Sequence, residues 1–280
     1  MDVAQRIAGA RDVLTKAERR VAEVVLQRPQ AVAFGTVAEL AAQSSAGAAT
    51  VVRLAGKLGY DGFTGLQSAV QTELEGRLRP AVERIRQPRP SDVLGVALQR
   101  ELGNVHESLD GIDRELFATA CAVLADPGRR LLVLSGEATR GVAIQCLTML
   151  GGLRSGVELL DGNPVAVAAR VGLVGAGDVL MAIDLRRYEA WVVDVATRAV
   201  AQGAEIVSIT DSRLSPLAAL GDRSFVVAAE GSGPFDSHVG TLAVLNALVA
   251  GVAERLQARA TSRLDSIEAA WRHAGVLSDT

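Results

Sequence analysis

The sequence lacks the features that mark a secreted, membrane-bound or metal-binding protein. It has two cysteines, Cys121 and Cys146, whose separation fits neither a CxxC motif nor a metal-ligand pair, so we interpret them as reduced core thiols. No apolar run approaches the ~18 residues that a membrane-spanning helix needs. Charged residues interrupt the first fifteen positions, where a signal peptide would be apolar. These absences predict a cytoplasmic protein with no membrane partner.

Basic side chains are concentrated in the first third of the chain, although the whole chain is slightly acidic. Residues 1–90 hold 13 Lys and Arg against 9 Asp and Glu, whereas the remaining residues hold 16 against 23, which leaves a net charge of −3. A basic segment joined to an acidic remainder suits a nucleic-acid-binding part attached to a second part. The length of 280 residues and the apolar share of 49% allow two folded domains.

The segment from Thr36 to Phe63 has the pattern of two short helices joined by a tight turn. Thr36 and Glu39 have the spacing of a capping box, which opens the first helix. Ser44-Ser45-Ala46-Gly47 breaks the helical pattern, and Gly59 ends a second helix of about eleven residues. This arrangement predicts a helix-turn-helix, with an ordinary helical hairpin as the alternative on spacing alone.

The second of these helices has one apolar face and one polar face. The residues expected to face inward, at i, i+3, i+4 and i+7, are Val51, Leu54, Ala55 and Leu58. Thr50, Arg53 and Lys57 are expected to share the outward face. We therefore predict that Thr50 and Arg53 contact phosphates or base edges of double-stranded operator DNA, and that Lys57 contacts a phosphate.

Helical patterns and then a linker complete the first part of the chain. Thr15 and Glu18 form a second capping-box pattern, which opens a helix that Pro29 is expected to stop. We assign residues 1–79 to an all-α helix-turn-helix domain. Residues 80–112, which begin with several prolines and arginines, are assigned to a linker and a lead-in helix.

After Asp126 the pattern changes to short β-rich runs that alternate with helical stretches. The expected strands are Leu131–Ser135, Val157–Leu160, Val179–Ile183, Glu205–Thr210 and Phe225–Ala228. The expected helices cover about 141–153, 164–173, 190–202 and 214–220. Such alternation predicts a doubly wound parallel five-stranded α/β domain over 113–258, followed by a tail over 259–280. The fold class is therefore an α domain followed by an α/β domain.

Ligands of parallel sheets bind at the carboxyl ends of the strands, where three loops carry polar side chains. In two of them the expected neutral donors are Thr139, Ser212 and Ser215, and each of these loops is expected to open a helix. In the third, Arg186 or Arg187 is expected to supply positive charge to a small anion. Two alternatives need no ligand. The hydroxyl residues are also explained by ordinary strand–helix turns, and the arginine pair by a solvated turn or a contact between subunits.

Two motifs resemble a known family. Gly203–Asp222 (GAEIVSITDSRLSPLAALGD), preceded by Gly177–Asp184 (GDVLMAID), resembles the second half of a SIS, or sugar isomerase, domain. Glu39–Phe63 resembles the DNA-binding part of the RpiR family of bacterial transcriptional regulators, and Leu14–Phe34 resembles the opening helix of that family. The resemblance implies a regulator of transcription at operator DNA, controlled by a phosphorylated sugar or a related metabolite in the SIS domain. It also implies a homodimer or a higher homo-oligomer.

The sequence departs from that family at two places. Ala46-Gly47 stands where the family has Val-Ser, so a hydroxyl before the recognition helix is missing. Asp184-Leu185-Arg186-Arg187-Tyr188-Glu189 stands where SIS domains commonly have a Ser-x-Ser-Gly-x-Thr run that holds the sugar phosphate. A DNA-binding dimer with a purely structural SIS domain is therefore one alternative.

A sugar-phosphate isomerase on the same fold is the other alternative. Aldose–ketose isomerisation needs a positioned base, usually Glu or His. Only His238 lies near an expected sheet edge, and a helix start explains it more simply, while His106 and His273 lie in the lead-in helix and the tail. No His, Cys, Asp or Glu cluster has metal-ligand spacing. We therefore predict a protein that is not an enzyme and needs no cofactor or metal.

Overall fold

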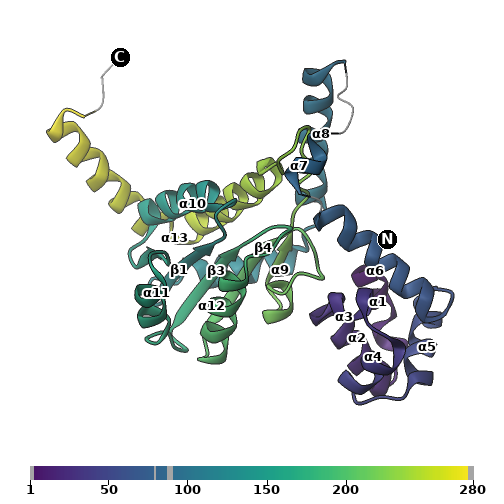
Figure 1. Cartoon of the computed structure of the whole chain (residues 1–280). Coiled ribbons are helices and arrows are strands. Elements are labelled where there is room, and N and C mark those ends of the chain that lie inside the picture. Colours follow the sequence, from purple (N-terminus) through teal and green to yellow (C-terminus); the bar gives the residue numbers. More distant parts are fainter. Residues whose placement is uncertain (1–2, 79, 87–90, 277–280) are drawn as a thin grey trace.

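The first domain is a bundle of short helices. The computed structural model describes residues 3–78, 80–86 and 91–276, and Figure 1 shows the helical domain beside a parallel α/β domain. Its elements are α1 (Val3–Ala10), the 3-10 helix η1 (Arg11–Val13), α2 (Lys16–Gln27), α3 (Pro29–Phe34), α4 (Val37–Gln43), α5 (Ala48–Lys57) and α6 (Gly62–Leu78). Both expected capping boxes form, at Thr15 with Glu18 and at Thr36 with Glu39. Pro29 occupies the first turn of α3, where its missing N–H has no partner to lose.

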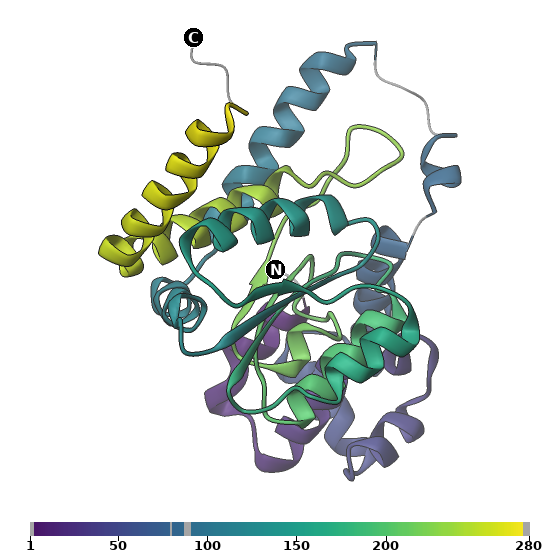
Figure 2. The ribbon, with the colours of Figure 1, turned by 90° about the vertical axis from the view of Figure 1, so that its left-hand side faces the viewer.

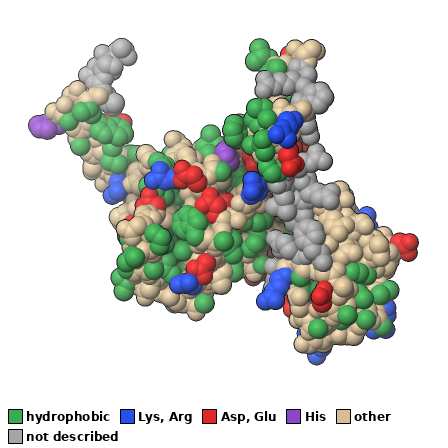
Figure 3. Space-filling model, in the orientation of Figure 1, with side chains coloured by type: hydrophobic (Ala, Val, Ile, Leu, Met, Phe, Trp, Pro, Cys, Tyr) green, Lys and Arg blue, Asp and Glu red, His purple; other side chains and the backbone are tan. Residues whose placement is uncertain are grey.

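Three helices lead from the bundle into the second domain. They are α7 (Ala81–Arg84), α8 (Val93–Asp110) and α9 (Arg114–Ala125). The N-terminal part of α8 projects from the molecule together with α7, and hydrophobic side chains gather on this projection (Figure 3). Residues 87–90 of the expected linker lie outside the described residues.

The second domain is built on a five-stranded parallel sheet, as the sequence predicts. Its strands are β1 (Arg130–Ser135), β2 (Val157–Leu159), β3 (Asp178–Ile183), β4 (Glu205–Thr210) and β5 (Ser224–Val226). They lie in the order β2-β1-β3-β4-β5, and every pair is parallel. The chain therefore extends the sheet in opposite directions from β1, which puts a topological switch point between β1 and β3.

Helices cover both faces of the sheet because alternate strand residues point to opposite sides. On one face lie α9, α10 (Arg140–Leu153) and α13 (Val239–Ala274), and on the other α11 (Pro164–Val171) and α12 (Ala190–Ala201). Val133 and Met181 pack on the first face, whereas Leu132 and Leu180 pack on the second. The fold class predicted from the sequence is thus confirmed.

Two segments differ from expectation. The stretch 214–220 forms only the short 3-10 helix η2 (Ala218–Leu220) after a series of turns. The expected tail is the second half of α13, which kinks at Gln257 and leaves the sheet as a projecting arm (Figure 2). By length and composition alone α13 meets the criteria for a membrane span, whereas from the sequence we expected no apolar run long enough for one. Its first half is nevertheless a core helix over the sheet, with Val244, Leu248 and Val252 fully buried.

The two domains meet at the loop after β4. Leu214, from this loop, is 2% exposed and belongs to the apolar core of the helical domain. Beside this contact lies a cleft of about 630 Å³, between residues of α1 and α2 and residues such as Arg213 and Asp222. The contact therefore links the carboxyl edge of the sheet directly to the helix-turn-helix domain.

Candidate DNA-reading and effector sites

The turn between α4 and α5 is fixed by hydrogen bonds from outside it. Arg20, on α2, donates from Nε to the carbonyl oxygen of Ser44 (3.2 Å) and from Nη2 to that of Ser45 (2.9 Å). The Ser44 hydroxyl donates to the carbonyl oxygen of Leu40 at 2.8 Å. Ser45 has a φ of 49°, in the left-handed region that a tight turn requires. These bonds set the direction in which α5 leaves the turn.

The buried face of α5 agrees with the sequence pattern, but the exposed face differs from it. Val51, Leu54, Ala55 and Leu58 are buried as predicted. The exposed residues are Ala48, Ala49, Val52, Arg53, Gly56 and Lys57. Thr50 is only 7% exposed, so the expectation that it shares the outward face was wrong. At ~100° per residue, Thr50 lies at the edge of the helix surface that turns toward the core.

Arg53 remains on the exposed face of α5, and its guanidinium Nη2 donates to the Thr50 hydroxyl at 3.2 Å. Thr50 therefore orients Arg53 rather than presenting its own hydroxyl to solvent. An arginine held in this way on a recognition helix can donate two parallel hydrogen bonds to a guanine edge.

Lys57 is engaged within the domain. Its ammonium donates to Glu18 Oε2 at 2.8 Å and to the carbonyl oxygen of Val13 at 3.0 Å. The Glu18 side chain is only 3% exposed, and the hydrogen bond from Lys57, followed by that from the Thr15 amide, lowers its pKa to about 2. Lys57 thus ties α5 to α2, and a phosphate contact by Lys57 would compete with this ion pair.

Replacing Lys57 with methionine is expected to lower the stability of the helical domain. The change leaves the Glu18 carboxylate buried without its cation, at a cost of ~1–3 kcal/mol. Because the pKa of folded Glu18 lies below the ordinary 4.5, the contribution of the pair is present above that pH and is lost as the pH falls toward 2. Urea unfolding at neutral pH measures the effect. The exposed Lys16→Met is the matched control, and equal destabilisation by both changes would contradict the role of the pair.

Carboxylates converge at the switch point between β1 and β3. Asp184 is 2% exposed, with Oδ1 accepting from the Leu185 amide (3.0 Å) and Oδ2 from the Glu189 amide (2.7 Å). Glu189 accepts from the Glu137 amide at 2.5 Å. A Cβ on Gly136 would lie 2.6 Å from Asp184 Oδ1 and 2.9 Å from Glu189 Oε1, so a side chain at this position would displace these carboxylates.

The protein thus supplies its own anion at the loop that leads into α10. The Glu189 carboxylate accepts from the Glu137 amide, a backbone donor near a helix start of the kind that binds external anions. Burial is the largest influence on Asp184 and raises its pKa to about 7. The crevice between β1 and β3 therefore favours hydrogen-bond donors over a second negative group.

The three hydroxyls predicted for the effector site are buried and hold the loops. The Thr139 hydroxyl donates to the carbonyl oxygen of Ile183 at 2.8 Å, which links the loops after β1 and β3. Ser212 and Ser215 accept from the backbone amides two residues ahead, at 2.9 and 3.2 Å. All three are 1% exposed or less, so they shape the strand-end loops from within.

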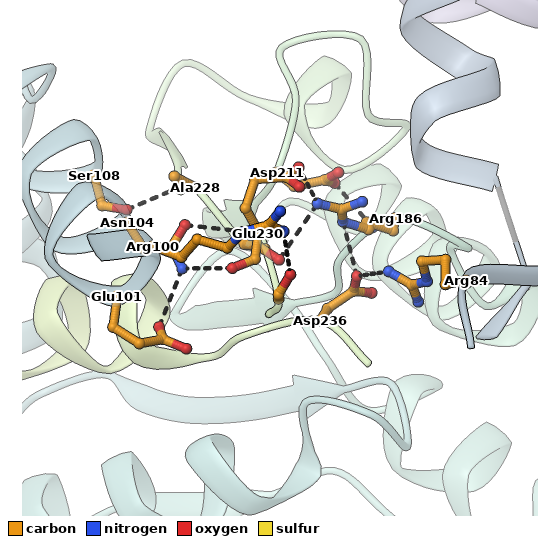
Figure 4. Close-up of polar contacts among 12 residues, drawn as sticks. Arg84, Arg100, Glu101, Asn104, Ser108, Arg186, Asp211, Ala228, Glu230 and Asp236 are labelled. Atoms are coloured by element: carbon orange, nitrogen blue, oxygen red, sulfur yellow. Dashed lines mark hydrogen bonds and ion pairs between the residues drawn. The ribbon is translucent and has the colours of Figure 1, made fainter. Parts of the chain in front are cut away.

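The two predicted arginines have different surroundings. Arg186 has a φ of 57° and its side chain is held between Glu230 (2.5 Å) and Asp236 (3.0 Å), with Arg84 on the other side of Asp236 (Figure 4). Its amide donates to Asp211 Oδ1 at 2.9 Å, which joins the loops after β3 and β4. Arg187, in contrast, is exposed. The two adjacent arginines therefore differ in role, because Arg186 is buried in ion pairs and Arg187 faces solvent.

A cavity of about 280 Å³ opens beside these loops at the ends of β1 and β2. Its lining residues are Ser135, Glu137, Arg140, Leu159, Leu160, Asp161, Gly162, Glu189 and Trp191. Arg140 pairs with Asp161 at 3.0 Å, and the Trp191 indole donates to Glu189 at 2.6 Å. Trp191 was not predicted from the sequence. It is one of only two tryptophans in the chain and it directly follows a strand-end loop, which was a usable signal.

Ionisation of Asp184 is expected to make stability depend on pH. Its folded pKa of about 7 lies above the ordinary 3.8, so its contribution is full below about pH 4 and is lost as the pH rises through about 7. At ~1.4 kcal/mol per pKa unit, the loss is at most on the order of 4 kcal/mol. The melting temperature should fall as the pH rises from about 4 to about 7, and it should fall less in Asp184→Asn. Equal slopes for the wild type and this variant would contradict the assignment, and the exposed Asp194→Asn is the control.

Curated relatives match most of the chain. The bifunctional protein glk of Burkholderia orbicola (strain AU 1054) is 25% identical over 218 residues, which is 77% of this chain but 33% of the relative. The chain thus spans about a third of the length of the first curated relatives it matches. An uncharacterized HTH-type transcriptional regulator of Haemophilus influenzae is 26% identical over 229 residues, 79% of this chain and 78% of the relative.

Solved structures share the fold. The NanR protein of Vibrio vulnificus, complexed with ManNAc-6P, superposes with a TM-score of 0.57 at 22% identity, over 99% of this chain and 100% of that one. The sugar isomerase domain of an RpiR transcription factor from Sphaerobacter thermophilus superposes with a TM-score of 0.59 at 24% identity, over 63% of this chain and 99% of that one.

Family models match both domains. The model of the helix-turn-helix domain of the rpiR family covers residues 1–76, and the model of the SIS domain covers residues 163–251. The first match contains the fixed turn and α5, and the second contains the strand-end loops after β3 and β4. The chain therefore combines a helix-turn-helix domain of the rpiR family with a SIS domain, the two parts of an RpiR-type transcriptional regulator.

Proposed function

We propose that the protein is a sequence-specific DNA-binding regulator that acts as a homodimer and responds to a sugar-type metabolite bound at the strand ends. The observation that carries the DNA-binding part is the exposed face of α5, which holds Arg53 beside a turn fixed by Arg20. The HTH-type regulator of Haemophilus influenzae supports the same function. Cytoplasmic location is part of the proposal because operator DNA lies there.

Arg53 is the proposed base-reading residue. Its replacement by alanine is expected to weaken operator binding by ~1–3 kcal/mol without changing the stability of the domain, because the side chain is exposed. Arg53→Lys keeps the charge but loses the paired donors, so it should recover little of the loss if Arg53 reads a guanine. Gel-shift titration at fixed salt, on DNA enriched from a random library by the full-length protein, measures both. Unchanged affinity in Arg53→Ala would remove Arg53 from the interface.

The proposed effector is a phosphorylated sugar or a related small anion, as in the NanR complex with ManNAc-6P. The hydroxyls of a sugar suit the carboxylates of Glu137 and Glu189, and Trp191 offers an aromatic surface beside them. A phosphate would have to stay away from these carboxylates. We propose that it contacts Arg187, the exposed arginine of the same loop.

The five predicted effector-site residues keep different roles in this proposal. Arg187 touches the effector, while Arg186 anchors the loop through Glu230 and Asp236. Thr139, Ser212 and Ser215 hold the loops in place by the bonds described above. A thermal-shift comparison of free sugars with their 6-phosphates tests the site, since a ligand at ~100 times its Kd adds ~2.7 kcal/mol. Binding that Arg187→Ala leaves unchanged would remove Arg187, and no binding at all would favour a purely structural SIS domain.

The isomerase alternative gains no support from the cavity. Isomerisation needs a base beside the substrate carbonyl. Among the described residues that line the cavity there is no histidine. Of its two glutamates, Glu189 already accepts hydrogen bonds from the Glu137 amide and the Trp191 indole, and Glu137 is exposed to solvent. The groups of His, Cys, Asp and Glu in the described part of the chain include none that could hold a metal ion. A regulator is therefore the proposed function of this site as well.

A further inference from the structure

The exposed face of α5 carries more uncharged than charged residues. Besides Arg53 and the engaged Lys57, the exposed residues of this helix are Ala48, Ala49, Val52 and Gly56. Val52 is 46% exposed, whereas its neighbour Val51 is completely buried. Among the described side chains of α1 to α6 and η1, Val13 and Val52 are the large apolar residues that remain exposed.

Packing within the domain does not explain Val52. The core of the helical domain includes Val51, Leu54, Ala55 and Leu58 from α5, but not Val52. A β-branched residue at an exposed helical position has no advantage in helix propensity either. The side chain of Val52 is therefore free to contact an apolar group of a partner outside the domain.

The DNA major groove offers one apolar group at the base edges, the C5-methyl of thymine. Ala49 and Val52 lie three positions apart and so are neighbours on one surface of the helix, and Arg53 follows Val52 directly. Ala48 and Ala49, at the N-terminal end of α5, are small enough for the helix to approach the base edges closely.

We propose that Val52, assisted by Ala49, recognises a thymine methyl group in the operator, beside the base that Arg53 reads. This inference rests on the proposed DNA-binding function. Val52 then determines sequence specificity through an apolar contact, while Arg53 does so through hydrogen bonds. The half-site accordingly contains at least one thymine whose methyl group, rather than its pairing edge, is read.

Deoxyuridine provides the test because it pairs like thymine and lacks only the methyl group. DNA is first enriched from a random library with the full-length protein, and each thymine of the enriched sequence is then replaced singly by deoxyuridine. At one position the replacement should weaken wild-type binding about fourfold, the equivalent of ~0.8 kcal/mol for one buried methyl-sized group. For Val52→Ala, the same replacement should have little effect.

The controls separate this inference from the proposed function. Val13→Ala removes the other exposed valine and should leave the deoxyuridine effect intact, and circular dichroism confirms that each variant is folded. If the protein enriches a sequence and no deoxyuridine replacement weakens binding, or if Val52→Ala keeps the effect, the thymine contact is overturned while DNA binding stands. If no sequence is enriched, the proposed function itself fails.

Discussion

The double substitution Leu98→Glu and Leu102→Glu is expected to convert the protein to a monomer. Both residues lie on α8 with Leu94, four positions apart in turn, and the three side chains are 57%, 58% and 84% exposed. Leucines at this spacing form one stripe along a helix. An exposed apolar stripe of this kind marks a protein interface.

A second copy of the chain is the partner that fits this stripe. A single recognition helix reads one half-site, and helix-turn-helix proteins bind two half-sites about one DNA turn apart through a two-fold dimer. The apolar first half of α13 does not provide this contact, because Val244, Leu248 and Val252 are buried over the sheet. We therefore place the proposed dimer contact on α8.

Loss of the dimer should lower operator affinity about 100-fold or more, because linked half-sites gain 10²–10⁴ from their joint binding. Light scattering at micromolar concentration gives the mass, and gel-shift titration gives the affinity. Leu173→Glu is the matched control, since Leu173 is 77% exposed in the loop after α11, away from α8. A wild-type monomer, or a double variant that stays dimeric, would contradict the assignment.

The substitution Leu214→Ala is expected to uncouple the two domains. Leu214 comes from the loop after β4 but is buried in the core of the helical domain. Truncating a buried leucine costs about 2–5 kcal/mol, and here the cost falls on the contact between the domains. The same loop begins at Asp211, which accepts from the Arg186 amide and the Tyr188 hydroxyl, both at 2.9 Å. We therefore propose that a shift of the loop after β3 is transmitted to the helical domain through Leu214.

Two measurements test this route. Calorimetry should show that the helical domain of Leu214→Ala melts at a lower temperature than the SIS domain, and the effector should no longer change DNA affinity although it still binds. Leu217→Ala is the control, because Leu217 is fully buried in the SIS core three residues further along the loop. It should destabilise the SIS domain and leave the helical domain unchanged. Unaltered coupling in Leu214→Ala would exclude this loop as the route.

The sequence by itself determined most of the secondary structure and the fold class of both domains. Capping boxes at Thr15 and Thr36 are local, because each needs only two residues three positions apart. The five strands were also predictable, since their apolar runs are bounded by polar segments and alternate with helices. The helical stretch over 214–220 failed because Leu214 and Leu217 belong to different cores, and a regular helix would not point them there.

The tertiary structure alone decided which polar side chains are available to a ligand. Lys57 pairs with Glu18 across 39 positions, Arg186 with Glu230 across 44, and Glu189 binds the Glu137 amide across 52. Periodicity reports which face of a helix or strand is buried, but it carries no information about a charge on a distant segment. The sequence therefore located the strand-end loops, and only folding showed that carboxylates of the protein already occupy part of them.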